Sequence, residues 1–247
     1  MLSANVVPGP NSPLRTKELV KPYHVYTVGG QKVGVIGITV KQKTEMSSSP
    51  SPGTYLLDEM TTAQKYIDEL KDPSMGVNKI ILLSHVGLAM DLKMAAALEG
   101  VDVIVGGDSH SLLGDVEELA IVPGATPVSH YPEVVTGRNG NTVCVVQAWQ
   151  YANTVGKLDL SFDSYGNVTA CSGRPIFPLA EASTWKDSAG NKLNSGTSEE
   201  IDFFLYSYIL FDVFCIQRLC HCVRKLLSYV SVSRLCLFFI LFCVSLS

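Results

Sequence analysis

A marked excess of charge of either sign is missing from this sequence. Its 247 residues contain 19 lysines and arginines against 23 aspartates and glutamates, which gives a net charge of −4 at pH 7. Non-specific binding to nucleic acid or to anionic lipid needs a basic surface, so the composition predicts no nucleic-acid partner. The first residues also lack a basic region followed by an apolar run. The sequence therefore predicts no export signal and leaves the location in the cell open.

Cysteine is scarce over most of the chain. Only Cys144 and Cys171 lie outside the last stretch, and the other five crowd residues 215–243. Two cysteines do not make a disulfide framework, and a bridge between them is possible in an oxidising compartment without being required by the sequence. The Cys220-His-Cys222 stretch lacks the two-residue gap that is usual in zinc motifs.

Long apolar runs are absent until the end of the chain, where the composition changes. The composition predicts one globular part at residues 1–180 and a linker at residues 181–202. Residues 203–247 are dominated by Phe, Leu, Cys, Val and Ser. A membrane span needs about 20 apolar residues, more than the run at 235–246 offers. The tail could be a membrane segment, a glycolipid-anchor signal or, as its lack of amphipathic order favours, unrelated sequence translated past a splice boundary. We expect an unrelated apolar tail that is not a folded domain, with membrane attachment possible but not favoured.

Strands and helices alternate through the globular part. A hairpin is predicted around Gly29-Gly30, and residues 43–53 form a predicted Ser- and Pro-rich loop. Apolar residues at helical spacing predict one helix, and Gly100 closes a second. The strands are apolar on both faces, which is typical of a layered α/β fold with strands buried between layers. The predicted strands are 23–27, 32–39, 78–85, 101–107, 142–149 and 156–163, and the predicted helices are 59–71 and 91–99.

Polar side chains follow two of the buried strands. His85 comes at the end of "NKIILLSH", and Asp108 and His110 come just after "VDVIVGG". In α/β folds the carboxyl ends of neighbouring strands meet at one edge, where sites form. A carboxylate with imidazoles suits a divalent ion such as Zn²⁺ or Mn²⁺, so the three residues are candidate metal ligands. Each also has an ordinary interpretation, His85 as a hydrogen-bonding residue, Asp108 as a turn acid and His110 as a surface residue.

Several stretches, found in one order, carry a resemblance to a known family. They are "LSAN" at 2–5, "VGVIGIT" at 33–39, "NKIILLSHVGLAMD" at 78–91, "GVDVIVGGDSH" at 100–110 and "VVQAWQYANTVGKLDLSFDSYGNV" at 145–168. Together they resemble the 5'-nucleotidase family of calcineurin-like metallophosphoesterases. The resemblance implies part of a four-layer α/β/β/α sandwich that binds two divalent ions, Zn, Mn or Mg. It also implies hydrolysis of nucleoside 5'-monophosphates to nucleoside and phosphate by a complete protein that is often secreted or surface-anchored.

The resemblance implies metal ligands residue by residue. Its Ser-His motif falls on His85, and its Gly-Gly-His-Ser motif puts two ligands on Asp108 and His110. Asp108 stands where many members have His, which leaves an oxygen ligand but could alter the metal preference or affinity. No catalytic or substrate-binding residue is implied for this chain.

Two departures from the family matter. The family's first ligands, an Asp-x-His pair, a bridging Asp and an Asn-His segment, precede the stretch that "LSAN" matches, and its base-clamping C-terminal domain has no counterpart after about residue 179. We therefore expect the second half of a catalytic domain, inactive by itself. Two alternatives stay open: a non-catalytic fragment that binds a metal or a partner chain, and a phosphoesterase that acts on other nucleotide phosphoesters.

Overall fold

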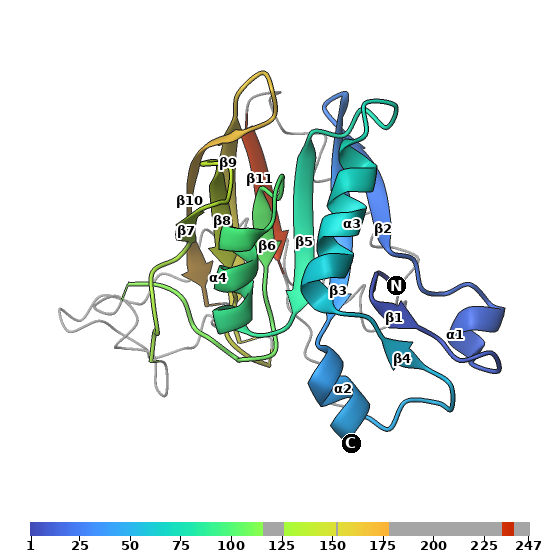
Figure 1. The fold of residues 1–247 in the computed structure, drawn as a ribbon. Coiled ribbons are helices and arrows are strands. Elements are labelled where there is room, and N and C mark those ends of the chain that lie inside the picture. The colour runs from blue at the N-terminus through green and yellow to red at the C-terminus, as the bar shows by residue number, and fades with distance from the viewer. Residues whose placement is uncertain (116–125, 152, 178–233, 240–247) are drawn as a thin grey trace.

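A six-stranded sheet forms the centre of the molecule (Figure 1), and its order is β2-β3-β5-β6-β8-β7. The computed structural model describes residues 1–115, 126–151, 153–177 and 234–239. The four inner strands are parallel: β3 (Gln31–Thr39), β5 (Lys79–His85), β6 (Val103–Val105) and β8 (Thr142–Val146). The edge strands β2 (Tyr23–Val28) and β7 (Glu133–Thr136) run antiparallel to their neighbours.

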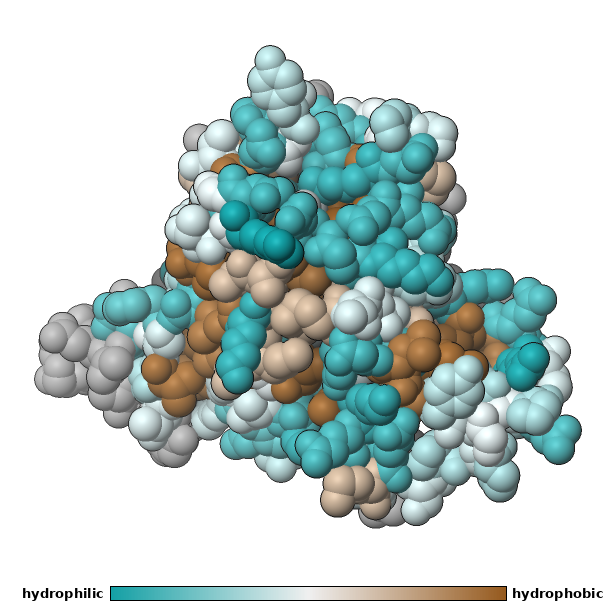
Figure 2. Space-filling view, viewed as in Figure 1, coloured by the Kyte–Doolittle hydropathy of each residue, from teal (hydrophilic) through white to brown (hydrophobic). Residues whose placement is uncertain are grey.

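Two helices, α3 (Glu59–Lys71) and α4 (Leu88–Ala97), cover one face of this sheet (Figure 1). The Asp58 side chain accepts a hydrogen bond from the Thr61 amide and so caps α3, whose predicted range is confirmed. Its buried side chains recur every three or four residues, and the outward surface over α3 is mostly hydrophilic in Figure 2. Helix α4 begins three residues before its predicted start, because Ser109, in a distant loop, accepts a hydrogen bond from the Leu88 amide.

A second sheet packs on the opposite face of the first. It has the antiparallel order β10-β9-β11, from β9 (Val155–Phe162), β10 (Val168–Ile176) and β11 (Arg234–Phe239). Ile80 and Leu82 of β5 point to the helices, whereas Ile81 packs with Leu158 and Leu160 of the second sheet. Both faces of the inner strands are therefore buried, which explains their continuous apolar sequences and confirms the predicted layered α/β fold.

A disulfide joins the two sheets. Cys144 of β8 is bonded to Cys171 of β10, with their Cα atoms 6.5 Å apart. The Cys144 side chain is fully buried between the sheets. The sequence left this pairing open, and the packing of β8 against the second sheet decides it.

The predicted loop at residues 43–53 is wrong at its start. Residues Lys41–Ser47 form helix α2, because "KQKTEMS" contains mainly good helix formers and the Ser/Pro bias begins only after it. The Glu45 carboxylate accepts a hydrogen bond from the Leu56 amide and so ties α2 to β4 (Tyr55–Leu56). Strand β4 pairs antiparallel with β1 (Val6–Val7), and a short helix, α1 (Pro13–Thr16), follows β1.

The predicted linker, residues 181–202, lies outside the described residues. Of the predicted tail, residues 203–247, only Arg234–Phe239 is described, and it pairs antiparallel with residues 156–161 of β9. The domain boundaries and the origin of the tail stay predictions. None of the helices in the described ranges is long and apolar enough to cross a membrane.

Candidate metal centre

Two of the three predicted ligands meet at the carboxyl ends of β5 and β6. These strands are adjacent and parallel, so His85, at the end of β5, and Asp108, just after β6, come out at the same edge. The His85 Nε2 atom lies 3.7 Å from the Asp108 Oδ1 atom. Two ligand atoms on one ion at about 2 Å are roughly this far apart, so the pair has a spacing that suits a shared cation.

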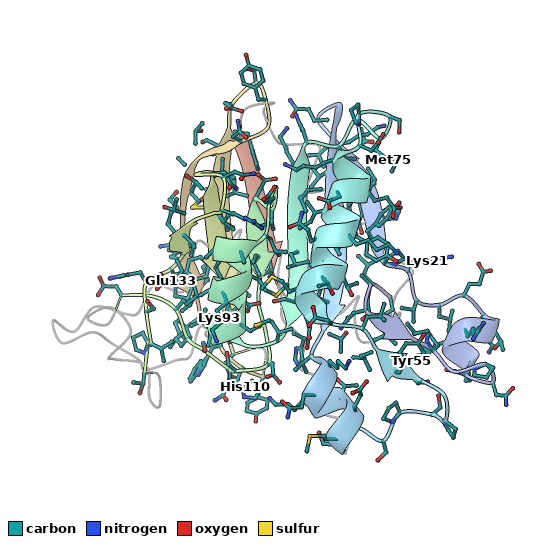
Figure 3. All side chains as sticks on the ribbon, in the orientation of Figure 1. Lys21, Tyr55, Met75, Lys93, His110 and Glu133 are labelled. Carbon is teal, nitrogen blue, oxygen red and sulfur yellow. A yellow bond between two sulfur atoms is a disulfide. The ribbon has the colours of Figure 1, made fainter. Side chains whose placement is uncertain are left out.

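His110 lies at the same end of the molecule and contacts a different partner. Figure 3 shows it at the lower end of the view, the end at which β5 finishes. Its ring packs edge-on against the Tyr151 ring, with the ring centroids 5.1 Å apart. Within the described ranges no group of three His, Cys, Asp or Glu side chains is close enough to hold an ion. The prediction that His85, Asp108 and His110 share a metal centre therefore stays a prediction.

A residue that the sequence did not single out also contacts Asp108. The Lys43 ammonium on α2 donates to both Asp108 carboxylate oxygens, each at 2.6 Å. The two residues are 65 positions apart, so no local pattern could have paired them. The Asp108 side chain is largely buried at 14% exposure, whereas that of Lys43 is 60% exposed.

The surroundings of His85 favour its neutral imidazole. Burial lowers the pKa of His85, and the nearby Lys43 ammonium lowers it further, against the opposite effect of Asp108. A neutral imidazole presents a lone pair, and it is this form of histidine that binds metal ions. The lowered pKa therefore favours the form of His85 that can bind a metal ion.

A buried glutamine holds the loop that carries Asp108 and His110. The Gln147 side chain, 1% exposed, accepts hydrogen bonds from the Ser111 amide and the Ser109 hydroxyl and donates to the Gly107 carbonyl. The Gly87 amide also donates to the Gly107 carbonyl. Gln147 lies within a stretch that carries the family resemblance, but its role follows only from the packing of β8 beside β6.

The backbone at this end of the sheet is strained. Asp108 and His110 have φ angles of +73° and +51°, and Trp149 and Tyr151, after β8, have φ angles of +59° and +52°. Positive φ is uncommon for residues other than glycine and costs on the order of 1–3 kcal/mol each in a sparsely populated region. Such strain persists where the surroundings impose it, and it clusters at functional sites.

A carboxyl group is buried beneath the loop. Asp91 on α4 is fully buried, accepts a hydrogen bond from the Ser84 hydroxyl through Oδ1, and has no hydrogen-bond partner at Oδ2 among the described residues. Burial raises the pKa of Asp91 to about 7. A Cβ atom at Gly106 would lie 2.1 Å from Asp91 Oδ2, so only glycine fits there.

Another buried amide fixes the end of β3. The Asn5 side chain accepts a hydrogen bond from the Thr39 amide and donates to the carbonyls of Thr39 and Leu57. It is fully buried. The "LSAN" stretch thus positions β3, whose last residue, Thr39, pairs with His85 of β5.

Comparisons with known proteins give close matches over most of the chain. It is 40% identical over 192 residues to a probable 5'-nucleotidase of Treponema pallidum, which covers 78% of this chain and 31% of that protein. A 5'-nucleotidase precursor of Thermus thermophilus aligns with a TM-score of 0.63 and 43% identity over 71% of this chain and 33% of that one. The NAD nucleotidase of Haemophilus influenzae aligns with a TM-score of 0.68 and 36% identity, over 81% and 39% of the two chains. The chain thus spans about a third of the length of these relatives. No model of a protein family matches it.

Proposed function

Because its matched part belongs to the 5'-nucleotidase family of calcineurin-like metallophosphoesterases, we propose that this chain carries part of a domain that hydrolyses nucleoside 5'-monophosphates. The described residues have the fold of that family. The observation that carries the proposal is the approach of His85 Nε2 to Asp108 Oδ1 at 3.7 Å, at the carboxyl ends of adjacent parallel strands. The products of the proposed reaction are a nucleoside and phosphate.

The family is metal-dependent, and the donors at this edge of the sheet fit a divalent ion in part. His85 offers an uncharged nitrogen and Asp108 a carboxylate, which suit Zn²⁺ or Mn²⁺, while the carboxylate also suits Mg²⁺. We propose His85, Asp108 and His110 as ligands within a two-ion centre of the whole protein. When bound, such ions polarise phosphoryl oxygens and make a water molecule more nucleophilic.

The residues of this chain contribute by holding those donors in place. Gln147 fixes the loop on which Asp108 stands, and the hydrogen bond from the Val40 amide to the His85 carbonyl fixes the end of β5. Rigid placement of charged and polar groups removes reorganisation from the reaction and is a large part of catalysis by electrostatic stabilisation. The positive φ angles of Asp108 and His110 show that the surrounding structure imposes this loop conformation.

The experiment is phosphate release from AMP by the purified chain with Zn²⁺, Mn²⁺ or Mg²⁺. Two donors in contact supply only part of one coordination shell, so we expect turnover by this chain alone to be many orders of magnitude below that of an efficient enzyme. His85→Ala is the test variant, and His24→Ala, which changes an exposed histidine on β2, is its matched control. Robust turnover that His85→Ala abolishes would contradict the expectation and would mean that further residues of this chain complete the centre.

A second substrate class is favoured by one relative. The NAD nucleotidase of Haemophilus influenzae is 36% identical and has a TM-score of 0.68. We therefore propose nucleotide phosphoesters other than monophosphates as the alternative substrates. Assaying NAD beside AMP separates the two classes, because cleavage of NAD without phosphate release from AMP favours the second.

A further inference from the structure

The contact between Lys43 and Asp108 has the geometry of a bound cation. Both carboxylate oxygens lie 2.6 Å from the Lys43 Nζ atom, so the ammonium sits between the two oxygens, as a cation bound to both would. One of these oxygens, Oδ1, also faces the His85 Nε2 atom at 3.7 Å. A positive charge thus already occupies the carboxylate that is the strongest metal donor at this edge of the sheet.

Lys43 can leave this position without loss of the fold. Its side chain is 60% exposed and comes from a helix that buries no residue. Helix α2 keeps two other attachments, since the Lys41 amide donates to the Glu59 carboxylate and the Leu56 amide donates to the Glu45 carboxylate.

We propose that Lys43 is an internal competitor for a divalent cation at Asp108, an inference that rests on the proposed metal centre. A lysine ammonium and a divalent ion repel each other strongly at the separation that one carboxylate allows. Binding of the ion therefore breaks both Lys43–Asp108 hydrogen bonds and releases the side chain to solvent. Lys43 therefore weakens metal binding at this edge of the sheet. Its ammonium is bound to Asp108 when the metal is absent and is released to solvent when the metal binds.

The first test measures Mn²⁺ binding to the whole chain by electron paramagnetic resonance of the free ion. The Lys43 ammonium is mostly exposed, and an ion pair screened by solvent is worth up to about 1 kcal/mol, so we expect Lys43→Met to lower the Kd by about three- to fivefold. Lys41→Met is the matched control, since it removes the same charge from the same helix and does not touch the Asp108 carboxylate. An equal Kd for wild type and Lys43→Met, or an equal gain in Lys41→Met, would overturn the inference.

The second test measures the reactivity of the Lys43 amine directly. We expect Mn²⁺ to speed reductive methylation of Lys43, detected by mass spectrometry, while Lys41 reacts at an unchanged rate. A Lys43 rate that Mn²⁺ leaves unchanged, or lowers, contradicts the proposal even if the ion binds.

The two levels of the argument fail in different ways. If wild type binds Mn²⁺, His85→Ala loses it and Lys43→Met leaves the Kd unchanged, the Lys43 inference is refuted and the proposed centre stands. If His85→Ala weakens Mn²⁺ binding neither in the wild type nor in Lys43→Met, the proposed metal centre is refuted. The inference that Lys43 competes with the ion is then refuted as well.

Discussion

Asp91 makes the stability of the fold depend on pH in a way that one substitution can isolate. Its carboxyl group is fully buried, and only the Ser84 hydroxyl donates to it among the described residues. Burial raises its pKa to about 7 from 3.8. Since the folded pKa lies above the unfolded one, the folded state binds the proton more tightly, and stability falls as pH rises from about 4 to about 7.

The size of the effect follows from that shift. One pKa unit corresponds to about 1.4 kcal/mol, so ionisable Asp91 costs the fold about 4 kcal/mol at pH 8 and about 2 kcal/mol at pH 5. Asparagine has the same shape, cannot ionise, and keeps an oxygen to accept from Ser84. We therefore expect Asp91→Asn to raise the free energy of unfolding, relative to wild type, by about 2–3 kcal/mol more at pH 8 than at pH 5.

The assay is urea unfolding of both proteins at pH 5 and pH 8, with a chelator present in every sample. Any change common to the two pH values reports altered hydrogen bonding, and only the difference between them reports the charge. Asp159→Asn, which alters an exposed carboxylate on β9, controls for the general effect of removing an acid. A difference between pH values no larger for Asp91→Asn than for this control would refute the reasoning and mean that Asp91 is solvated in the folded state.

Three further variants test the parts that hold the fold and the site together. Gly106→Ala places a methyl group 2.1 Å from the Asp91 Oδ2 atom, and we expect thermal unfolding to show a loss of about 1–3 kcal/mol in stability. An unchanged Tm would argue against close packing of that loop. Gln147→Ala leaves the Ser111 amide without its partner and removes one of the hydrogen bonds to the Gly107 carbonyl, and we expect a loss of about 1–3 kcal/mol in urea unfolding together with faster amide exchange at Ser111, neither of which should appear if the loop holds itself. Changing both Cys144 and Cys171 to serine opens a loop of 27 residues, and the chain-entropy model predicts a loss of about 3.5 kcal/mol in the free energy of unfolding. A reducing agent should destabilise the wild type and cause no further loss in this variant.

The sequence by itself determined the elements whose causes are local. Helix α3 was predicted at its observed bounds, because its cap at Asp58 and its apolar spacing both lie within the segment. The apolar inner strands predicted a layered α/β fold for the same reason, since a strand buried on both faces must lack alternation. His85 and Asp108 were placed at one edge because parallel strands present the same end to it.

Only the tertiary structure decided what depends on contacts between distant segments. Lys43 meets Asp108 across 65 residues, and α4 starts early because Ser109 accepts a hydrogen bond from its first amide. The disulfide forms because β8 packs against the second sheet. The His110 ring contacts the Tyr151 ring because the loops after β6 and β8, which both contain residues with positive φ angles, bring them together. No local pattern along the chain links α2 to the loop after β6, so the contact of Lys43 with Asp108 could be read only from the folded molecule.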